Sequence, residues 1–247
     1  MTASRKVALR PSIPGPWWVI TPKPSLDDRL PQLSETYSEA DSYQRNQPND
    51  HHVFQAADGT WQLWACVRRT PVGRLLVNWE AESLDASPWR LSGRLIRADR
   101  DAGESMVEWQ GEEFLQSPYI VRDNGRYHLF YGGYDTGMDS DGRTTDDYND
   151  AEKQICLMTS PDGLTWERHR GQDGTSRVFA GPGAVRDECV VRFGDTWYIY
   201  YAGHHDRNRR RAAIYGRTSK DLINWSDWCV VEENTADADE FIPESPV

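Results

Sequence analysis

The sequence lacks several features that would place it in a specialised class. None of its apolar runs approaches the roughly 20 residues that a membrane-spanning helix needs. The N-terminal stretch MTASRKVALRPSIPGPWWVI is too short in its apolar part, and too interrupted by prolines, for a convincing signal peptide. Basic residues number 28 against 39 acidic ones, and the net charge of −11 argues against binding to nucleic acid or anionic lipid. We therefore expect a cytoplasmic protein that binds neither nucleic acid nor membrane.

Cysteine is also scarce, and its placement excludes some kinds of site. The four cysteines are isolated, lie mostly within apolar stretches and form no CxxC pair. They are Cys66, Cys156, Cys189 and Cys229. We expect buried free thiols rather than disulfides or a zinc site, and no cofactor.

What the sequence does contain is aromatic residues, 11 Trp, 11 Tyr and 6 Phe. Amphipathic helices of useful length are hard to find, whereas short aromatic and β-branched runs bounded by Gly, Asp, Asn and Pro are common. That pattern predicts an all-β fold. Three segments share a strand, a tight glycine turn and an aromatic strand, and they begin at Val53, Tyr119 and Cys189. The aromatic residues next to the three turns are Trp61, Tyr127 and Trp197.

A second element recurs downstream of each of these hairpins. In residues 81–89, 158–166 and 217–225, a Ser is followed by an Asp two residues later and a Trp four residues further on. Each unit is therefore expected to hold two hairpins, with the Trp packed between neighbouring sheets. A four-stranded sheet repeated at this spacing is typical of a β-propeller blade.

The repeats also predict the domain organisation. They begin near residues 48, 116, 186 and 243, and the last contains only PESPV. Because three whole blades cannot close a ring, we expect a propeller domain over residues 45–247 that is C-terminally incomplete within its fourth blade. Residues 1–44 are Pro-rich and do not fit the repeat, so we expect an irregular segment that either wraps the outside of the domain or leads into the first blade.

An acidic insertion at residues 135–153 interrupts the second unit. The simplest interpretation is a solvated loop. A structural calcium site is the alternative, because Asp139, Asp141 and Asp146 supply hard oxygen ligands, although their spacing is not that of an EF-hand.

The starts of the first strands locate a candidate site. In a propeller these strands line the central channel, so equivalent positions from different blades converge at one mouth. The acidic residues at that position are Asp50, Asp187 and Glu244. In the second unit Gln116 and Ser117 occupy the same level, where they could donate hydrogen bonds to sugar hydroxyls.

Three converging carboxyl groups suit glycoside hydrolysis. Crowded carboxylates repel one another, so at least one should hold its proton to higher pH. The reaction needs one ionised carboxylate as base or nucleophile and one protonated carboxyl group as acid. For a single Asp the structural alternative is a turn cap or an ion pair, and Arg186 is a charge partner available to Asp187.

The order Asp, Asp, Glu at strand starts resembles the five-bladed propeller glycosidases of glycoside hydrolase families 43 and 32. Asn49-Asp50 stands where their first Asp is expected, with His51 in place of the proline that often follows. Arg186-Asp187 looks like their Arg-Asp-Pro element, with Glu188 in the proline position, and Glu244-Ser245-Pro246 is similar to Glu-Gly-Pro. The resemblance covers roughly residues 45–247.

The resemblance implies a five-bladed propeller that hydrolyses furanosidic or pentosidic linkages in oligo- or polysaccharides containing arabinose, xylose or fructose. It makes Asp50 the general base or nucleophile, Asp187 the residue that orients the acid, and Glu244 the general acid. Because chain ends fray, a loosely held Glu244 would leave this chain inactive. The other residues predicted to contact substrate are Gln116, Ser117, Arg186, Glu188, His51 and Trp79. The alternatives are a non-catalytic carbohydrate-binding propeller and a related glycoside phosphorylase.

Overall fold

A computed structural model describes residue 20 and residues 46–70, 72–104, 113–133, 153–183, 185–204 and 212–233. Within these ranges the chain forms β-strands and a single three-residue 3-10 helix, so the predicted all-β fold is confirmed. No helix in the described ranges has the length and apolar character needed to cross a bilayer.

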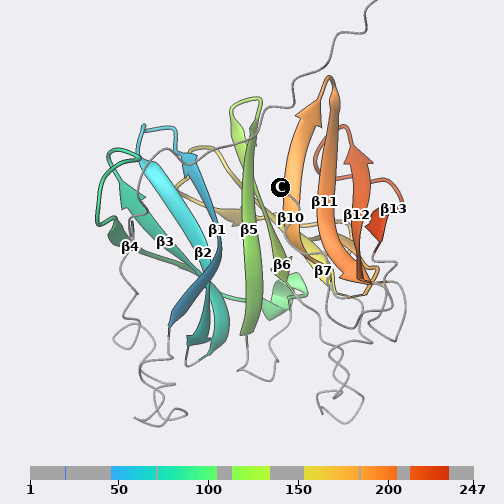
Figure 1. The fold of residues 1–247 in the computed structure, drawn as a ribbon, viewed down its shortest axis with the longest axis horizontal. Coiled ribbons are helices and arrows are strands. Elements are labelled where there is room, and N and C mark those ends of the chain that lie inside the picture. Colours follow the sequence, from blue (N-terminus) through green and yellow to red (C-terminus); the bar gives the residue numbers. More distant parts are fainter. Residues whose placement is uncertain are drawn as a thin grey trace, which may run out of the picture.

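The strands form three consecutive antiparallel meanders, which we call units 1, 2 and 3 (Figure 1). Unit 1 contains β1 (Gln47–Gln55), β2 (Trp61–Thr70), β3 (Gly73–Ala81) and β4 (Arg90–Ile96). Unit 2 contains β5 (Glu113–Asp123), β6 (Arg126–Gly133) and β7 (Gln154–Ser160), with β8 (Glu167–Arg168) and β9 (Arg177–Ala180) both paired to β7. Unit 3 contains β10 (Arg186–Phe193), β11 (Thr196–His204), β12 (Ala212–Ser219) and β13 (Cys229–Glu233). The helix η3 (Arg100–Ala102) lies between units 1 and 2.

Units 1 and 2 are also joined by a short parallel pairing of β3 with β5. Gly73 lies opposite Glu113 there, with φ of +107°. A Cβ atom on Gly73 would lie 2.3 Å from the backbone oxygen of Glu113. Only glycine therefore allows the two strands to approach this closely.

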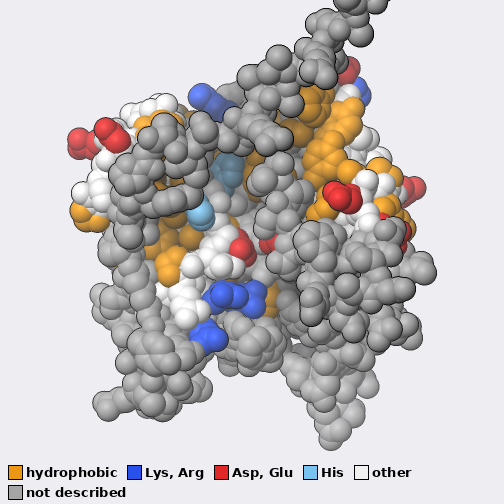
Figure 2. All heavy atoms as spheres, viewed as in Figure 1, with side chains coloured by type: hydrophobic (Ala, Val, Ile, Leu, Met, Phe, Trp, Pro, Cys, Tyr) orange, Lys and Arg blue, Asp and Glu red, His pale blue; other side chains and the backbone are white. Residues whose placement is uncertain are grey.

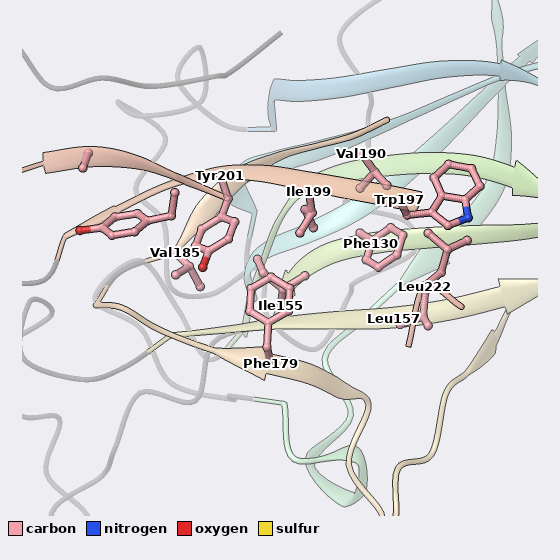
Figure 3. Close-up of a cluster of buried hydrophobic side chains, with 12 residues drawn as sticks. Phe130, Ile155, Leu157, Phe179, Val185, Val190, Trp197, Ile199, Tyr201 and Leu222 are labelled. Atoms are coloured by element: carbon pink, nitrogen blue, oxygen red, sulfur yellow. The ribbon is translucent and has the colours of Figure 1, made fainter. Parts of the chain in front are cut away.

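Large apolar side chains fill the spaces between units. One cluster joins unit 1 to unit 2 through Trp64, Leu129 and Met158. A second joins unit 2 to unit 3, where Ile199 and Tyr201 of β11 face Phe130 and Phe179 (Figure 3). Because neither unit could bury these faces alone, packing between units supplies much of the core.

Two of the three repeated Trp residues pack between neighbouring sheets, as predicted, whereas Trp89 packs within unit 1. Trp166 of unit 2 lies edge-on to Phe54 of unit 1, with ring centroids 6.2 Å apart. Trp225 of unit 3 meets Phe130 of unit 2 in the same way at 5.9 Å. In unit 1 the Trp89 backbone N–H donates to the carbonyl of Ile20 at 2.7 Å, so this part of the N-terminal segment lies against the first unit.

The Ser-x-Asp turns that precede these Trp residues have one shared geometry in units 2 and 3. Ser160 Oγ donates to Asp162 Oδ1 at 2.9 Å, and the equivalent Ser219 Oγ donates to Asp221 Oδ1 at 3.0 Å. Backbone N–H groups of Thr165 and then Leu164 lower the pKa of Asp162 to about 2. Each turn is therefore built around an ionised aspartate that accepts from the backbone.

Candidate active site

The first strands of the three units lie side by side in the middle of the molecule (Figure 1). Each strand has an irregularity near its start, at Asn49/His51, Gln116/Tyr119 and Arg186/Cys189. At each irregularity one non-glycine residue has a positive φ: Asp50 at 31°, Ser117 at 52° and Asp187 at 58°. Such backbone costs of order 1–3 kcal/mol per residue and clusters at functional sites. Three equivalent strained positions therefore mark one level of the fold.

The side chains of these three residues meet. Ser117 Oγ donates to Asp187 Oδ1 at 2.9 Å and lies 3.4 Å from Asp50 Oδ2. Two carboxyl groups from units 1 and 3 are thus held on either side of a hydroxyl from unit 2. Like charges at such separations repel one another, so this grouping needs compensating donors.

Two of those donors are sequence neighbours. Asn49 Nδ2 donates to Asp50 Oδ1 at 2.6 Å. Arg186 Nε lies 3.5 Å from Asp187 Oδ2, which makes it the charge partner that the sequence suggested. Figure 2 shows acidic and basic side chains close together near the middle of this face.

Gln116 is buried beside the carboxyl groups rather than exposed to solvent. Its side chain accepts from Arg74 Nη1 at 2.5 Å, and the Arg74 guanidinium stacks 4.1 Å above the Phe114 ring. Sequence analysis missed Arg74, whose only signal is a cation at the start of the apolar strand GRLLVNW. It places a buried positive charge on Gln116, the residue before Ser117 in β5.

Glu188 is 4% exposed, and both carboxyl oxygens are buried without a hydrogen-bond partner. Burial first, and then the charges of Asp187 and Asp50, raise the pKa of this carboxyl group well above its usual value. A buried acid of this kind is neutral, because an isolated buried charge is too costly. The sequence predicts that Glu188 contacts substrate directly. Its side chain lies in the interior, which does not suit such a contact.

Trp79 requires a correction. It was expected to line the pocket, but its side chain is 0% exposed and packs within unit 1 against Leu63 and Leu91. Strand β3 is buried on both faces, so alternation along its sequence gave no indication of which side faces the site.

The two histidines after Asp50 differ from each other. His51 is exposed, whereas His52 packs on the Tyr119 ring at 4.3 Å. Burial, followed by the neighbouring His51, lowers the pKa of His52 to about 4. His52 is therefore neutral near pH 7 and adds no charge to the carboxylate group.

The cysteines are free, and three of them, Cys66, Cys156 and Cys189, are buried as expected, whereas Cys229 is exposed. Burial raises the pKa of Cys66 to about 12, so this thiol is not a nucleophile. No group of three or more His, Cys, Asp or Glu residues in the described ranges could hold a metal ion. Glu244 and the acids considered for calcium, Asp139, Asp141 and Asp146, lie outside the described residues.

Comparisons with known proteins bear on the fold. No protein-family model matches the chain. A 1,2-β-oligomannan phosphorylase from Thermoanaerobacter sp. (strain X514) is 26% identical over 135 residues, which are 54% of this chain and 43% of that protein.

Solved structures of glycosidases share the architecture. The GH32 β-fructofuranosidase of Bombyx mori superposes with a TM-score of 0.52 and 18% identity, over 86% of this chain and 44% of that one. An endo-1,4-β-xylanase from Bacteroides thetaiotaomicron superposes with a TM-score of 0.53 and 16% identity, over 76% of this chain and 61% of that one. The α-L-arabinofuranosidase Arb93A of Fusarium graminearum superposes with a TM-score of 0.51 and 17% identity, over 80% of this chain and 50% of that one.

The chain spans about half the length of most of these relatives. Their likeness establishes the overall fold and not the number of blades, which stays a prediction. The chain has the fold of the β-propeller glycosidases.

Proposed function

We propose that this protein is a carbohydrate-active enzyme, a glycoside hydrolase that cleaves furanosidic or pentosidic linkages in oligo- or polysaccharides. The observation that carries the proposal is the meeting of Asp50, Ser117 and Asp187 at strained positions of three inner strands. The fold, which is shared with a fructofuranosidase, a xylanase and an arabinofuranosidase, supports it.

The geometry separates the roles of the two aspartates. A serine hydroxyl lies between Asp50 and Asp187, so no sugar ring can lie there. The two carboxyl groups therefore do not act from opposite sides of a scissile bond, as an acid and its partner must. Asp50 is the base or nucleophile, and Asp187, held by Arg186 and Ser117, orients groups around the leaving oxygen.

A third carboxyl group is then needed as the general acid. Glu244 has that role in the proposal, because it occupies the equivalent position of the next sequence repeat. A general acid must come within hydrogen-bond reach of the leaving oxygen. Hydrolysis would proceed by protonation of that oxygen and cleavage of the glycosidic C–O bond. The anomeric carbon is then captured either by a water molecule that gives its proton to Asp50, or by Asp50 itself, in which case water hydrolyses the resulting glycosyl ester in a second step.

The test is hydrolysis of a panel of aryl arabinofuranosides, xylosides and fructosides by the wild type, Asp50→Asn and Asp195→Asn. Asp195 is an exposed residue in the turn between β10 and β11, at the opposite end of β10 from Asp187, and serves as the matched control. Asp50→Asn should lose roughly 10²–10⁴-fold in rate, while Asp195→Asn keeps wild-type rates and both variants keep the wild-type urea midpoint. If the folded wild type binds these sugars but turns over none of them, the protein is a carbohydrate-binding propeller.

Phosphorolysis is a second candidate, and two observations favour it. Part of the chain is 26% identical to an oligomannan phosphorylase. The cations Arg74 and Arg186 lie beside the carboxylate group, where they could attract an anionic nucleophile. In this reaction inorganic phosphate replaces water, and the product is a sugar 1-phosphate instead of a free sugar. Turnover that requires phosphate, read from the product with β-1,2-linked mannobiose as substrate, would decide for it.

A further inference from the structure

Glu188 occupies an unusual position in the repeat. In β10 the strand pairing is irregular between Arg186 and Cys189, so Asp187 and Glu188 both lie in the irregularity. The corresponding residues of β5 are Ser117 and Pro118. Pro118 is buried, as Glu188 is, so the interior position that holds an apolar ring in unit 2 holds a carboxyl group in unit 3.

No cation or side-chain donor in the described ranges pairs with this carboxyl group, and the backbone N–H of Glu188 itself, which favours the charged form, acts less strongly than burial. Its oxygens are both buried and accept no hydrogen bond from another side chain. A buried carboxylate normally has a cation or several N–H donors as partners, because burying it alone is expensive. The chain therefore retains an acid at this position without the interactions that would stabilise its charge.

The groups that act on Glu188 are acidic or neutral. Asp187 on its own strand and Asp50 on β1 carry negative charge towards it. From β7, Cys156 faces it as a neutral thiol, because burial raises the pKa of that thiol far above physiological pH. From β5 the neighbouring Gln116 and Ser117 do not titrate. Each of these surroundings favours the protonated form of Glu188.

We propose that Glu188 is a positioning residue of the site: a neutral acid whose ionisation at alkaline pH adds a third negative charge to the Asp50–Asp187 pair and disrupts it. A neutral Glu188 adds no charge beside the two aspartates that share the Ser117 hydroxyl. An ionised Glu188 repels Asp187 from the interior side, and the geometry set by Ser117 is lost. The effect on catalysis rests on the proposed function, whereas the effect on stability does not.

The direction of the pH dependence follows from the raised pKa. Well below the usual value of 4.5, Glu188 is protonated in both the folded and the unfolded chain. Above it the unfolded chain releases the proton while the folded protein retains it, so the contribution of Glu188 to stability falls as pH rises. A side chain that cannot ionise removes this dependence.

The first experiment is urea unfolding between pH 5 and pH 9 of the wild type, Glu188→Gln and Glu82→Gln. Glu82 is an exposed glutamate after β3 and is the matched control. We expect Glu188→Gln to match the wild type at pH 5 and to have the higher urea midpoint at pH 8 and above, while Glu82→Gln follows the wild type throughout. Curves that stay parallel across the whole range would overturn the proposal.

Glu188→Met repeats the measurement with an apolar side chain of similar length, in case the amide does not fold. Infrared spectra add a readout that needs neither folding energetics nor turnover. The wild type at pH 7 should show a protonated carboxyl band that Glu188→Gln lacks. An identical spectrum for the two proteins would mean that Glu188 is ionised, and the proposal would fail.

The second experiment applies once a substrate is found. The wild-type rate should fall roughly tenfold per pH unit above the ionisation of Glu188, whereas the rate of Glu188→Gln, expressed relative to its own value at pH 6, should stay level to higher pH. If the rate of Glu188→Gln falls at the same alkaline pH as that of the wild type, Glu188 does not control catalysis in this way. If no substrate is found, the proposed function fails, and the unfolding and infrared measurements still test Glu188.

Discussion

Two glutamates of this protein are buried to almost the same degree but differ in the partners of their carboxyl groups. Glu104 is 3% exposed and Glu188 is 4% exposed. Glu104 accepts from Arg168 Nε and Nη2, both at 2.8 Å, from Ser176 Oγ at 2.9 Å, and from the Tyr131 hydroxyl. Glu188 accepts from no other side chain in the described ranges.

The difference shows that burial by itself does not distinguish a structural acid from a functional one. Glu104 follows η3 and connects it to β6, to β8 and to Ser176 just before β9, so its charge fixes the connection between units 1 and 2 against unit 2. Glu188 lies beside two carboxylates at the centre, where its charge would serve no structural purpose. The partners of a buried acid, more than its depth, indicate its role.

The largest effect is expected from removing the satisfied glutamate. Glu104→Ala leaves the guanidinium of Arg168, which is 17% exposed, without its main partner. Breaking a buried pair in this way costs about 3–5 kcal/mol. Urea unfolding at pH 7 measures the loss, with the exposed neighbour Glu167→Ala as control. A loss no larger than that of the control would mean that Glu104 and Glu188 are alike after all.

A smaller effect is expected when the charge is kept and the geometry is changed. Arg168→Lys retains one positive charge but cannot donate to both Glu104 oxygens and to the Arg97 carbonyl. We expect a loss of about 1.5–3 kcal/mol in the free energy of unfolding, the value of a hydrogen bond to a charged group. Equal stability of the two proteins would show that charge alone satisfies Glu104.

The smallest effect is expected at an exposed ion pair between units. Arg192 Nη1 lies 2.9 Å from Asp123 Oδ1, a distance close to those in the Glu104 group, but the Arg192 side chain is 46% exposed. Arg192→Met keeps the apolar stem and removes the charge, so we expect a loss of about 0.2–1 kcal/mol in the free energy of unfolding. The difference should shrink further in 1 M salt. A loss as large as that of Glu104→Ala would show that distance, and not burial, decides these interactions.

Much of the framework could be predicted from the sequence. Trp61, Tyr127 and Trp197 each follow a glycine turn between paired strands, as their repeated spacing indicated. The repeat also placed Asp50, Ser117 and Asp187 at one level, and the structure brings their side chains together. The catalytic roles of these residues, and of Glu244, remain predictions.

Other features had no local signal. The sequence could not indicate that Trp79 belongs to the core, because β3 is buried at every position from Gly73 to Trp79, Arg74 and Asn78 included, so alternation does not report which side faces inward. Nor could it identify Arg74 as a neighbour of Gln116, since the two are 42 residues apart. Glu188 was unexplained because an irregular strand does not show which way its side chains point.

The sequence by itself determined the repeated hairpins, the Ser-x-Asp turns and the level at which the acids occur, because these depend on alternation and on residues close along the chain. Only the tertiary structure decided which acids find partners. Arg168 and Ser176 reach Glu104 from 64 and 72 residues away, whereas no such segment reaches Glu188 within the described chain. Charge compensation over such separations requires the units to pack, so the same residue type is a structural anchor at position 104 and an uncompensated acid at position 188.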